Sequence, residues 1–293
     1  MHLCCFKKNG GEVPAIHFEN RIYPISELFR VLERSDQMVG YSTTEQILSI
    51  ARDPSLMASL LGAVPRSKGL GERDIEYGVP IRGPVIGVGR NYQDHVGEGK
   101  LTLGDYPKLF FKHVNSLTAH NQKVTIPPTI QKTDWEAELG VVIGKRMFQV
   151  KEEDAIDYVA GFLNINDVSA REYQFDLGPA QTSFAKSMDG FCPCGPWLVT
   201  ADEVPDCQNL RVRCELNGEV VQDANTSNMI YSVAYILSYI SQFMTLEPGY
   251  MVSTGTPQGI GHFRDPPRYL DDGDVIEVSV DRLGSLRNQF IRV

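Results

Sequence analysis

Short apolar segments bounded by turn residues dominate the chain beyond residue 82, and this pattern predicts β-strands. We expect strands at 85–88, 109–112, 138–143, 158–166, 210–216, 251–253 and 275–280. One long helix interrupts them at 232–243, where apolar residues recur at three- and four-residue steps from Val233 to Phe243. Many strands with few helices predict an α+β, β-rich fold with a barrel-like or sandwich-like main domain rather than alternating βαβ units.

The first part of the chain has a different pattern. Two short strands flank the turn at Gly10-Gly11, and helical spacing follows at 25–32 and 44–51. Pro80 and Pro84 then bracket a junction. We therefore predict a small N-terminal α/β domain at 1–78, which has no cluster of catalytic residue types, and a larger catalytic domain at 79–293.

The net charge of the chain argues against two classes of binding partner. The 28 Lys and Arg residues are outnumbered by 37 Asp and Glu residues, which gives a net charge of -9. Nucleic acid and anionic membranes carry charge of the same sign, so neither is expected as a partner. A small anionic substrate would need positive charge supplied locally, by a metal ion or a few buried Lys or Arg side chains.

The sequence predicts neither a secretion signal nor a membrane span. The first residues contain no long apolar run of the kind found in a secretion signal, and no later window is long and apolar enough to predict a membrane span. We therefore expect a cytoplasmic protein, or an organellar one only if a leader segment has been removed.

The stretch from 134 to 144 is the most informative for chemistry. If it forms a strand, the side chains alternate, so that Asp134, Glu136 and Glu138 point to one face. Three carboxylates on one face repel unless a cation or solvent separates them. Their oxygens would attract a hard divalent ion such as Mg²⁺ or Mn²⁺. With Glu136 and Glu138 as two ligands, Asp167, at the end of an apolar strand, offers a third. A solvated acidic strand face is the alternative.

A histidine and a glutamate follow the first strand of the larger domain. If the chain turns helically after Tyr92, His95 and Glu98 lie at positions i and i+3 and can touch. A carboxylate that holds one imidazole nitrogen leaves the other to take a proton from water, as a general base does. An ordinary surface pair on a helix is the alternative.

Two lysines and a glycine-rich loop add further candidates. Lys112 and Lys186 each follow a pair of apolar residues, so they are either buried near anionic groups or directed to solvent. Residues 253–261 follow a strand and contain too much glycine for a regular element. The backbone N–H groups of this loop either hold a carboxylate or oxyanion or form a plain turn.

The order of these pieces resembles a known family. GRNYxDH, FFK, DWExELGVVIGK, NDVSARxxQ, FAKSMD and TGTPxGxG follow one another along the chain. Together they resemble the fumarylacetoacetate hydrolase family from about Arg82 to the C-terminus. The tail at 263–274 resembles the subgroup that carries a small N-terminal domain. The resemblance implies a mixed β-roll or barrel-like catalytic domain and a homodimer or higher homo-oligomer.

The resemblance also implies roles for individual residues. Mg²⁺ or Mn²⁺ would be bound by Glu136, Glu138 and Asp167. His95 and Glu98 would form a water-activating pair on a lid, and Lys186 would stand beside the metal. The substrate-binding residues implied are Arg90, Tyr92, Lys112, Arg171, Gln174 and Thr256.

The activity implied is hydrolysis of a C–C bond in a small 2,4-dioxo acid through a pyruvate enolate. Decarboxylation of oxaloacetate, isomerisation or tautomerisation of a 2-oxo-enoate, and dehydration of a sugar acid all pass through a similar enolate, so the same ligands allow them. A catalytically silent metal-binding protein is the alternative outside enzymes.

Overall fold

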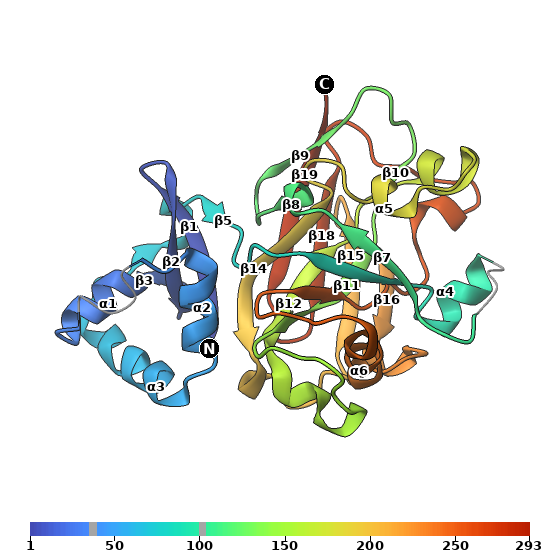
Figure 1. The fold of residues 1–293 in the computed structure, drawn as a ribbon. Helices are drawn as coiled ribbons and strands as arrows, with labels where there is room; N and C mark the ends of the chain where they lie inside the picture. Colours follow the sequence, from blue (N-terminus) through green and yellow to red (C-terminus); the bar gives the residue numbers. More distant parts are fainter. Residues whose placement is uncertain (35–39, 100–103) are drawn as a thin grey trace.

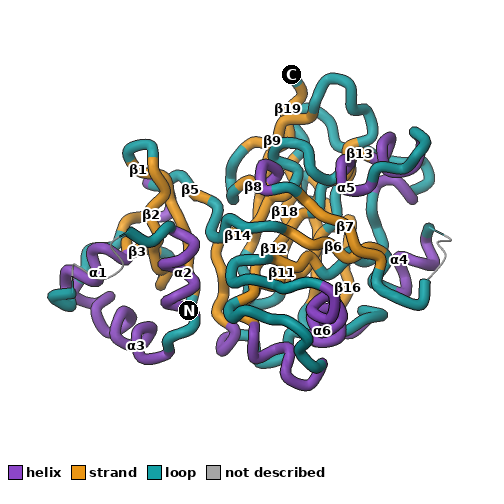
Figure 2. Tube along the Cα trace, viewed as in Figure 1, coloured by secondary structure: helices purple, strands orange, loops and turns teal. Residues whose placement is uncertain are grey.

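The computed structural model describes residues 1–34, 40–99 and 104–293, without the side chains of His95 and Val96. Figure 1 shows a smaller N-terminal part beside a larger, strand-rich part. In Figure 2 the strands concentrate in the larger part, whereas much of the smaller one is helical. The elements of the smaller part are β1 His2–Lys8, β2 Gly11–Phe18, β3 Arg21–Pro24, α1 Ile25–Val31, α2 Thr43–Ala51, α3 Pro54–Ala63, β4 Leu70–Gly71 and β5 Tyr77–Gly78.

The larger part contains most of the strands. Its helices are α4 Gln93–Glu98, α5 Thr182–Ala185 and α6 Val233–Phe243. Its strands are β6 Val85–Gly89, β7 Lys108–Lys112, β8 Leu117–Thr118, β9 Lys123–Ile126, β10 Thr133–Asp134, β11 Ala137–Ile143, β12 Val159–Asn166, β13 Ser169–Ala170, β14 Cys192–Thr200, β15 Arg211–Leu216, β16 Glu219–Asn225, β17 Met251–Ser253, β18 Val275–Val280 and β19 Ser285–Arg292.

Two sheets enclose the main core. A twelve-stranded sheet runs in the order β4-β3-β2-β1-β14-β12-β11-β17-β6-β7, with β5 paired to β1 and β8 to β14. A five-stranded sheet runs in the order β16-β15-β18-β19-β9. Side chains from both sheets, among them Phe162, Val278 and Phe290, are buried in one apolar cluster. Neither sheet closes on itself, so the predicted β-rich α+β class holds and the expected barrel is two open sheets.

The smaller part continues the large sheet. Strand β1 pairs antiparallel with β14, with Leu3 opposite Leu198. The helices of this part are capped locally: Ser42 accepts a hydrogen bond from the backbone of Glu45 at the start of α2, and Asp53 accepts one from Leu56 at the start of α3. The predicted division at residues 78 and 79 stays a prediction, because backbone pairing crosses between the two parts.

Strand ends gather at one edge of the large sheet. Strand β11 runs antiparallel to both β12 and β17, and β17 runs parallel to β6. The start of β11 therefore lies beside the ends of β12, β17 and β6. Strand β7 is antiparallel to β6 and begins there too, with Lys108 opposite Gly89. Segments far apart in the sequence meet at this edge.

One predicted element is wrong in detail. The acidic stretch is not one continuous strand, because β10 ends at Asp134 and β11 begins at Ala137. The backbone N–H of Glu136 instead donates to the side chain of Asn166, at 3.1 Å. The alternation rule therefore does not govern all three carboxylates, although the chain still brings them together.

No single helix among residues 1–34, 40–99 and 104–293 has the length and apolar composition needed to cross a membrane. Helix α2 and the helical segment Pro54–Arg66 meet both criteria only together, as a strongly bent pair.

The side chain of Asn164 connects the two sheets by hydrogen bonds. Its buried side-chain amide donates to the carbonyls of Gly195, Leu283 and Gly284, and its oxygen accepts from the backbone of Val280. Asn164→Ala would leave these groups unsatisfied, so we expect the free energy of unfolding to fall by about 2–4 kcal/mol.

Urea unfolding followed by circular dichroism measures this change. The matched control is Asn209→Ala at an exposed position, which should stay within about 0.5 kcal/mol of the parent protein. An equal effect of both substitutions would contradict the fastening role of Asn164.

Candidate metal centre and active site

Three buried carboxylates converge at the sheet edge. Glu136 lies between β10 and β11, Glu138 lies in β11, and Asp167 directly follows β12. The backbone N–H of Asp167 donates to the carbonyl of Glu136 at 2.9 Å, which fixes the two segments together. One oxygen from each of the three carboxylates lies within 4.8 Å of the others. All three residues are at most 6% exposed, so the solvated acidic face considered above is excluded.

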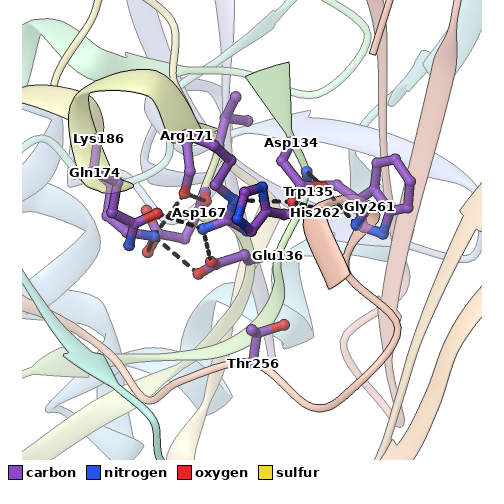
Figure 3. A network of polar contacts seen from close by, with 12 residues as sticks. Asp134, Trp135, Glu136, Asp167, Arg171, Gln174, Lys186, Thr256, Gly261 and His262 are labelled. Carbon is purple, nitrogen blue, oxygen red and sulfur yellow. Dashed lines mark hydrogen bonds and ion pairs between the residues drawn. The ribbon is translucent and has the colours of Figure 1, made fainter. Parts of the chain in front are cut away.

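Cations surround part of this triad, as Figure 3 shows. The ammonium of Lys186 contacts Glu136 at 2.9 Å and Asp167 at 2.5 Å. Lys112 contacts the other oxygen of Asp167 at 2.6 Å, and Arg171 contacts Glu136 at 2.7 Å. Buried like charges are costly unless they are paired and hydrogen-bonded. Glu136 and Asp167 are therefore stabilised mainly by these three cations.

The carboxylate of Glu138 differs from the other two in accepting hydrogen bonds from uncharged groups. One of its oxygens accepts hydrogen bonds from the hydroxyl of Ser253 at 2.5 Å and the backbone N–H of Gly255 at 2.8 Å. The other oxygen, Oε1, is buried and has no hydrogen-bond partner among the described residues. Burial, and then the charges of Asp167 and Glu136, raise the pKa of the Glu138 carboxyl well above its usual value.

The donor set fits a divalent ion. A hard cation prefers carboxylate oxygens, and a positive charge among these three groups would offset their repulsion and satisfy Glu138 Oε1. Glu136, Glu138 and Asp167 are the residues that could hold it. The sequence prediction of these three as a group thus corresponds to one compact cluster.

Lys186 remains a cation despite its burial. It caps the short helix α5, and its ammonium also donates to the hydroxyl of Ser169 at 2.7 Å. Burial alone would lower its pKa, but the carboxylates of Asp167 and Glu136 outweigh this effect, so the pKa is raised. The ring of Phe110 lies 4.8 Å from the ammonium. Lys186 therefore lies against the acidic group, and its place beside a bound metal stays a prediction.

Arg171 joins the triad to a second acidic residue, Asp134. Its Nε atom contacts Asp134 at 2.9 Å, and its Nη1 atom donates to Gln174 at 2.6 Å. Its remaining nitrogen, Nη2, is buried without a hydrogen-bond partner among the described residues. Because Arg171 and Gln174 both line the cavity, this donor is suited to an anionic ligand.

Asp134 is a positioning residue that the sequence interpretation did not identify. Its carboxylate also accepts the backbone N–H groups of Gly261 and His262, at 2.7 and 2.9 Å. It therefore fixes both Arg171 and the loop after β17. The alternating acidic pattern pointed to Asp134, but only the fold shows that it lies behind Arg171 rather than with the triad (Figure 3).

The glycine-rich loop of residues 253–261 lines the site instead of forming a plain turn. Gly255 adopts a positive φ of 100°, and a Cβ there would lie 2.7 Å from that of Asn91, so only glycine fits. The hydroxyl of Thr256 donates to the carbonyl of Ala137 and accepts from Gln222, while the residue faces the cavity.

The predicted water-activating pair is only partly described. Glu98 ends helix α4, and both of its carboxylate oxygens accept the backbone N–H of Gly259 at 3.1 Å. This contact ties α4 to the glycine-rich loop. The side chain of His95 lies outside the described residues, so the pairing of His95 with Glu98 stays a prediction.

Some predicted substrate contacts lie away from the cavity. Arg90, Arg171, Gln174 and Thr256 line it together with Glu136 and Lys186. Lys112 does not, because its fully buried ammonium is engaged by Asp167 and the carbonyl of Val168. Tyr92 is also buried outside it. The cavity-lining residues that the sequence interpretation missed include Lys108, Phe110, Phe175 and Phe263.

Comparison with known proteins establishes the family. The sequence profile described as "Fumarylacetoacetate (FAA) hydrolase C-terminal" matches residues 84–291. The chain belongs to the fumarylacetoacetate hydrolase family. Its members include hydrolases, isomerases and tautomerases, and the family resemblance drawn from the ordered motifs is confirmed.

Two curated relatives are named for different activities. The chain is 43% identical to 2,4-didehydro-3-deoxy-L-rhamnonate hydrolase of Sphingomonas sp. (strain SKA58) over 80% of its own length and 82% of the relative's. It is 40% identical to the mitochondrial oxaloacetate tautomerase FAHD2A of Homo sapiens, over 84% and 77% of the two chains.

Solved structures share the fold over the whole chain. The fumarylacetoacetate hydrolase of Exiguobacterium antarcticum superposes with a TM-score of 0.83 at 32% identity, covering all of both chains. The maleylpyruvate hydrolase of Sphingobium sp. SYK-6, solved with manganese(II) and pyruvate, superposes with a TM-score of 0.81 at 26% identity, covering 100% and 99% of the two chains.

Metal binding should stabilise the folded chain. A ligand that binds only the native state raises the unfolding temperature with concentration, so millimolar Mn²⁺ or Mg²⁺ should raise the Tm of metal-stripped protein. Glu138→Gln, which removes the unsatisfied carboxylate, should abolish most of this rise. Differential scanning fluorimetry measures both effects.

Glu153→Gln, at an exposed position, is the matched control and should keep the full metal response. A Tm that is insensitive to both ions in the parent protein would contradict the metal centre.

Proposed function

We propose that the chain is a divalent-metal-dependent hydrolase that cleaves the C3–C4 bond of a small 2,4-dioxo acid and releases pyruvate. The buried Glu136, Glu138 and Asp167 cluster, with Lys186 in contact with two of its members, is the observation that carries this proposal. The hydrolase activities of the Sphingomonas and Sphingobium relatives support it.

The substrate-binding part of the mechanism follows from the cavity. A divalent ion held by the triad would polarise the 2-oxo group as a Lewis acid. Arg171 would receive the substrate carboxylate on Nη2, its buried nitrogen without a partner, and Asp134 holds the guanidinium in that orientation. Lys186, kept charged by its carboxylate neighbours, would stabilise the negative charge that develops on the enolate oxygen through its own positive charge.

The bond-breaking steps of the mechanism require a general base. His95, oriented by Glu98, would take a proton from water as that water attacks the C4 carbonyl. Collapse of the resulting adduct breaks the C3–C4 bond, so that C4 leaves as a carboxylic acid and the bond electrons form pyruvate enolate. Protonation at C3 then gives pyruvate. The tie between Glu98 and Gly259 would keep α4 close to the cavity during these steps.

Tautomerisation of oxaloacetate is a second candidate, because the human relative is 40% identical over 84% of this chain. Keto–enol exchange moves a proton between C3 and the 2-oxo oxygen and breaks no C–C bond. Lys186 and Arg171 could have the same roles in this reaction. No water attacks C4 in it, so the pair of His95 and Glu98 would not be needed as a water-activating base.

The deciding experiment compares substrates. Metal-stripped protein is given acetylpyruvate, a 2,4-dioxo sugar acid or oxaloacetate, with and without Mn²⁺, and pyruvate release is followed. We expect Mn²⁺-dependent release from a dioxo acid. Glu98→Gln should lower kcat by about 10²–10⁴-fold, because general-base catalysis is lost, while the Kd for Mn²⁺ changes little.

Glu219→Gln, an exposed glutamate, is the control and should leave kcat unchanged. Equal loss of turnover and metal affinity in Glu98→Gln would contradict the role of Glu98. Rapid enol–keto exchange of oxaloacetate, with no pyruvate released from any dioxo acid, would contradict the proposed hydrolase activity and support tautomerisation instead.

A further inference from the structure

The side-chain amide of Asn91 joins three segments around the acidic triad. Asn91 lies between β6 and α4 and is fully buried. Its Nδ2 atom donates hydrogen bonds to two backbone carbonyls, that of Thr254 at 2.7 Å and that of Tyr231 at 3.1 Å. Its Oδ1 atom accepts the backbone N–H of Tyr231 at 2.8 Å. Because a carbonyl only accepts and a backbone N–H only donates, these partners fix which end of the amide is the nitrogen.

A single peptide group lies between Asn91 and the acidic triad. The carbonyl of the peptide that joins Thr254 to Gly255 accepts from Asn91, and the N–H of the same peptide donates to Oε2 of Glu138 at 2.8 Å. Hydrogen bonds in such a chain polarise one another, so a donor on the carbonyl strengthens the bond made by the N–H. The peptide is also planar and rigid. Asn91 therefore acts on Glu138 through one rigid group.

The backbone around this peptide is held on both sides. Gly255 has a φ of 100°, and a Cβ there would lie 2.7 Å from the Cβ of Asn91 and 3.0 Å from the carbonyl oxygen of Val88. This close approach brings the amide of Asn91 within reach of the carbonyl of Thr254. On the other side, the backbone N–H and the hydroxyl of Thr254 both donate to the carbonyl of Leu139 in β11, at 3.1 and 2.9 Å.

The orientation of Glu138 depends on the donors that this loop supplies. Its Oε2 atom accepts from Gly255 and from the hydroxyl of Ser253, whereas Oε1 is buried with no hydrogen-bond partner among the described residues. The terminal torsion of a glutamate has broad energy minima, so a carboxylate that loses one of two donors can rotate. The two donors on Oε2 thus keep Oε1 available for an ion.

We propose that Asn91 is a positioning residue for Glu138: it orients the peptide between Thr254 and Gly255, and this peptide keeps Oε2 of Glu138 occupied so that Oε1 is left for the divalent ion. The inference rests on the proposed function for that ion, but not for the reaction that follows. If Asn91 only stabilised the fold, by joining the end of β6 to the segment before α6, its loss would not change metal affinity more than the loss of another buried amide.

Isothermal titration of Mn²⁺ into metal-stripped protein tests this role. Residues that orient a metal ligand change metal affinity by about 10- to 100-fold when they are replaced. We expect Asn91→Ala to raise the Kd for Mn²⁺ by about 10-fold, the lower end of this range, because one peptide separates Asn91 from Glu138. Asn91→Ser removes fewer atoms and should raise the Kd in the same direction, which keeps the test decisive if Asn91→Ala does not fold.

Asn288→Ala is the matched control. Asn288 is a buried amide whose Nδ2 atom also donates to two backbone carbonyls, those of Ala119 and Gln122, both at 2.8 Å. None of these three residues is among the described lining of the cavity. Both alanine substitutions should lower the free energy of unfolding, but only Asn91→Ala should weaken Mn²⁺ binding. An unchanged Kd in the Asn91 variants, or an equal rise in Asn288→Ala, would overturn the positioning role.

Pyruvate release from acetylpyruvate by the same preparations is the separate readout of the proposed function. A rise in the Kd for Mn²⁺ confined to the Asn91 variants, with no pyruvate released by the parent protein, would support the positioning role and contradict the hydrolase. Pyruvate release by the parent protein, with an unchanged Kd in the Asn91 variants, would contradict only the positioning role.

Discussion

The buried acidic triad is the constraint on which the rest of the site depends. The carboxylates of three residues that are each at most 6% exposed cannot share a small volume without compensating positive charge. Lys186, Lys112 and Arg171 supply part of it, and each comes from a different segment. Because Glu138 Oε1 still has no partner among the described residues, the arrangement leaves a place for a further cation. Electrostatics thus explains why so many charged side chains are buried together.

The sheet topology makes this assembly possible. Strand ends from β6, β12 and β17 meet the starts of β7 and β11 at one edge, so residues more than 100 positions apart in the sequence come into contact. Asp134 and Asn164 then hold the surroundings in place. Asp134 fixes Arg171 and the loop after β17, whereas Asn164 joins the two sheets.

The sequence predicted the elements with strong local patterns and missed those defined by distant partners. The helix at 232–243 and the strands at 251–253 and 275–280 agree with α6, β17 and β18, because apolar periodicity was clear there. Strand β14 escaped prediction, since its cysteines, prolines and glycine resemble a loop. The triad followed from residue type and motif order. The place of Lys108 in the cavity lining did not, because it depends on the pairing of β6 with β7.

The central claim is that Glu136, Glu138 and Asp167 hold a divalent ion in one place. Crystals soaked in Mn²⁺ and measured for anomalous diffraction test it most directly. The account predicts a single strong anomalous peak within coordination distance, about 2.0–2.6 Å, of oxygens from all three carboxylates, including Oε1 of Glu138. The absence of a peak there, or a peak bound only by other residues, would contradict it.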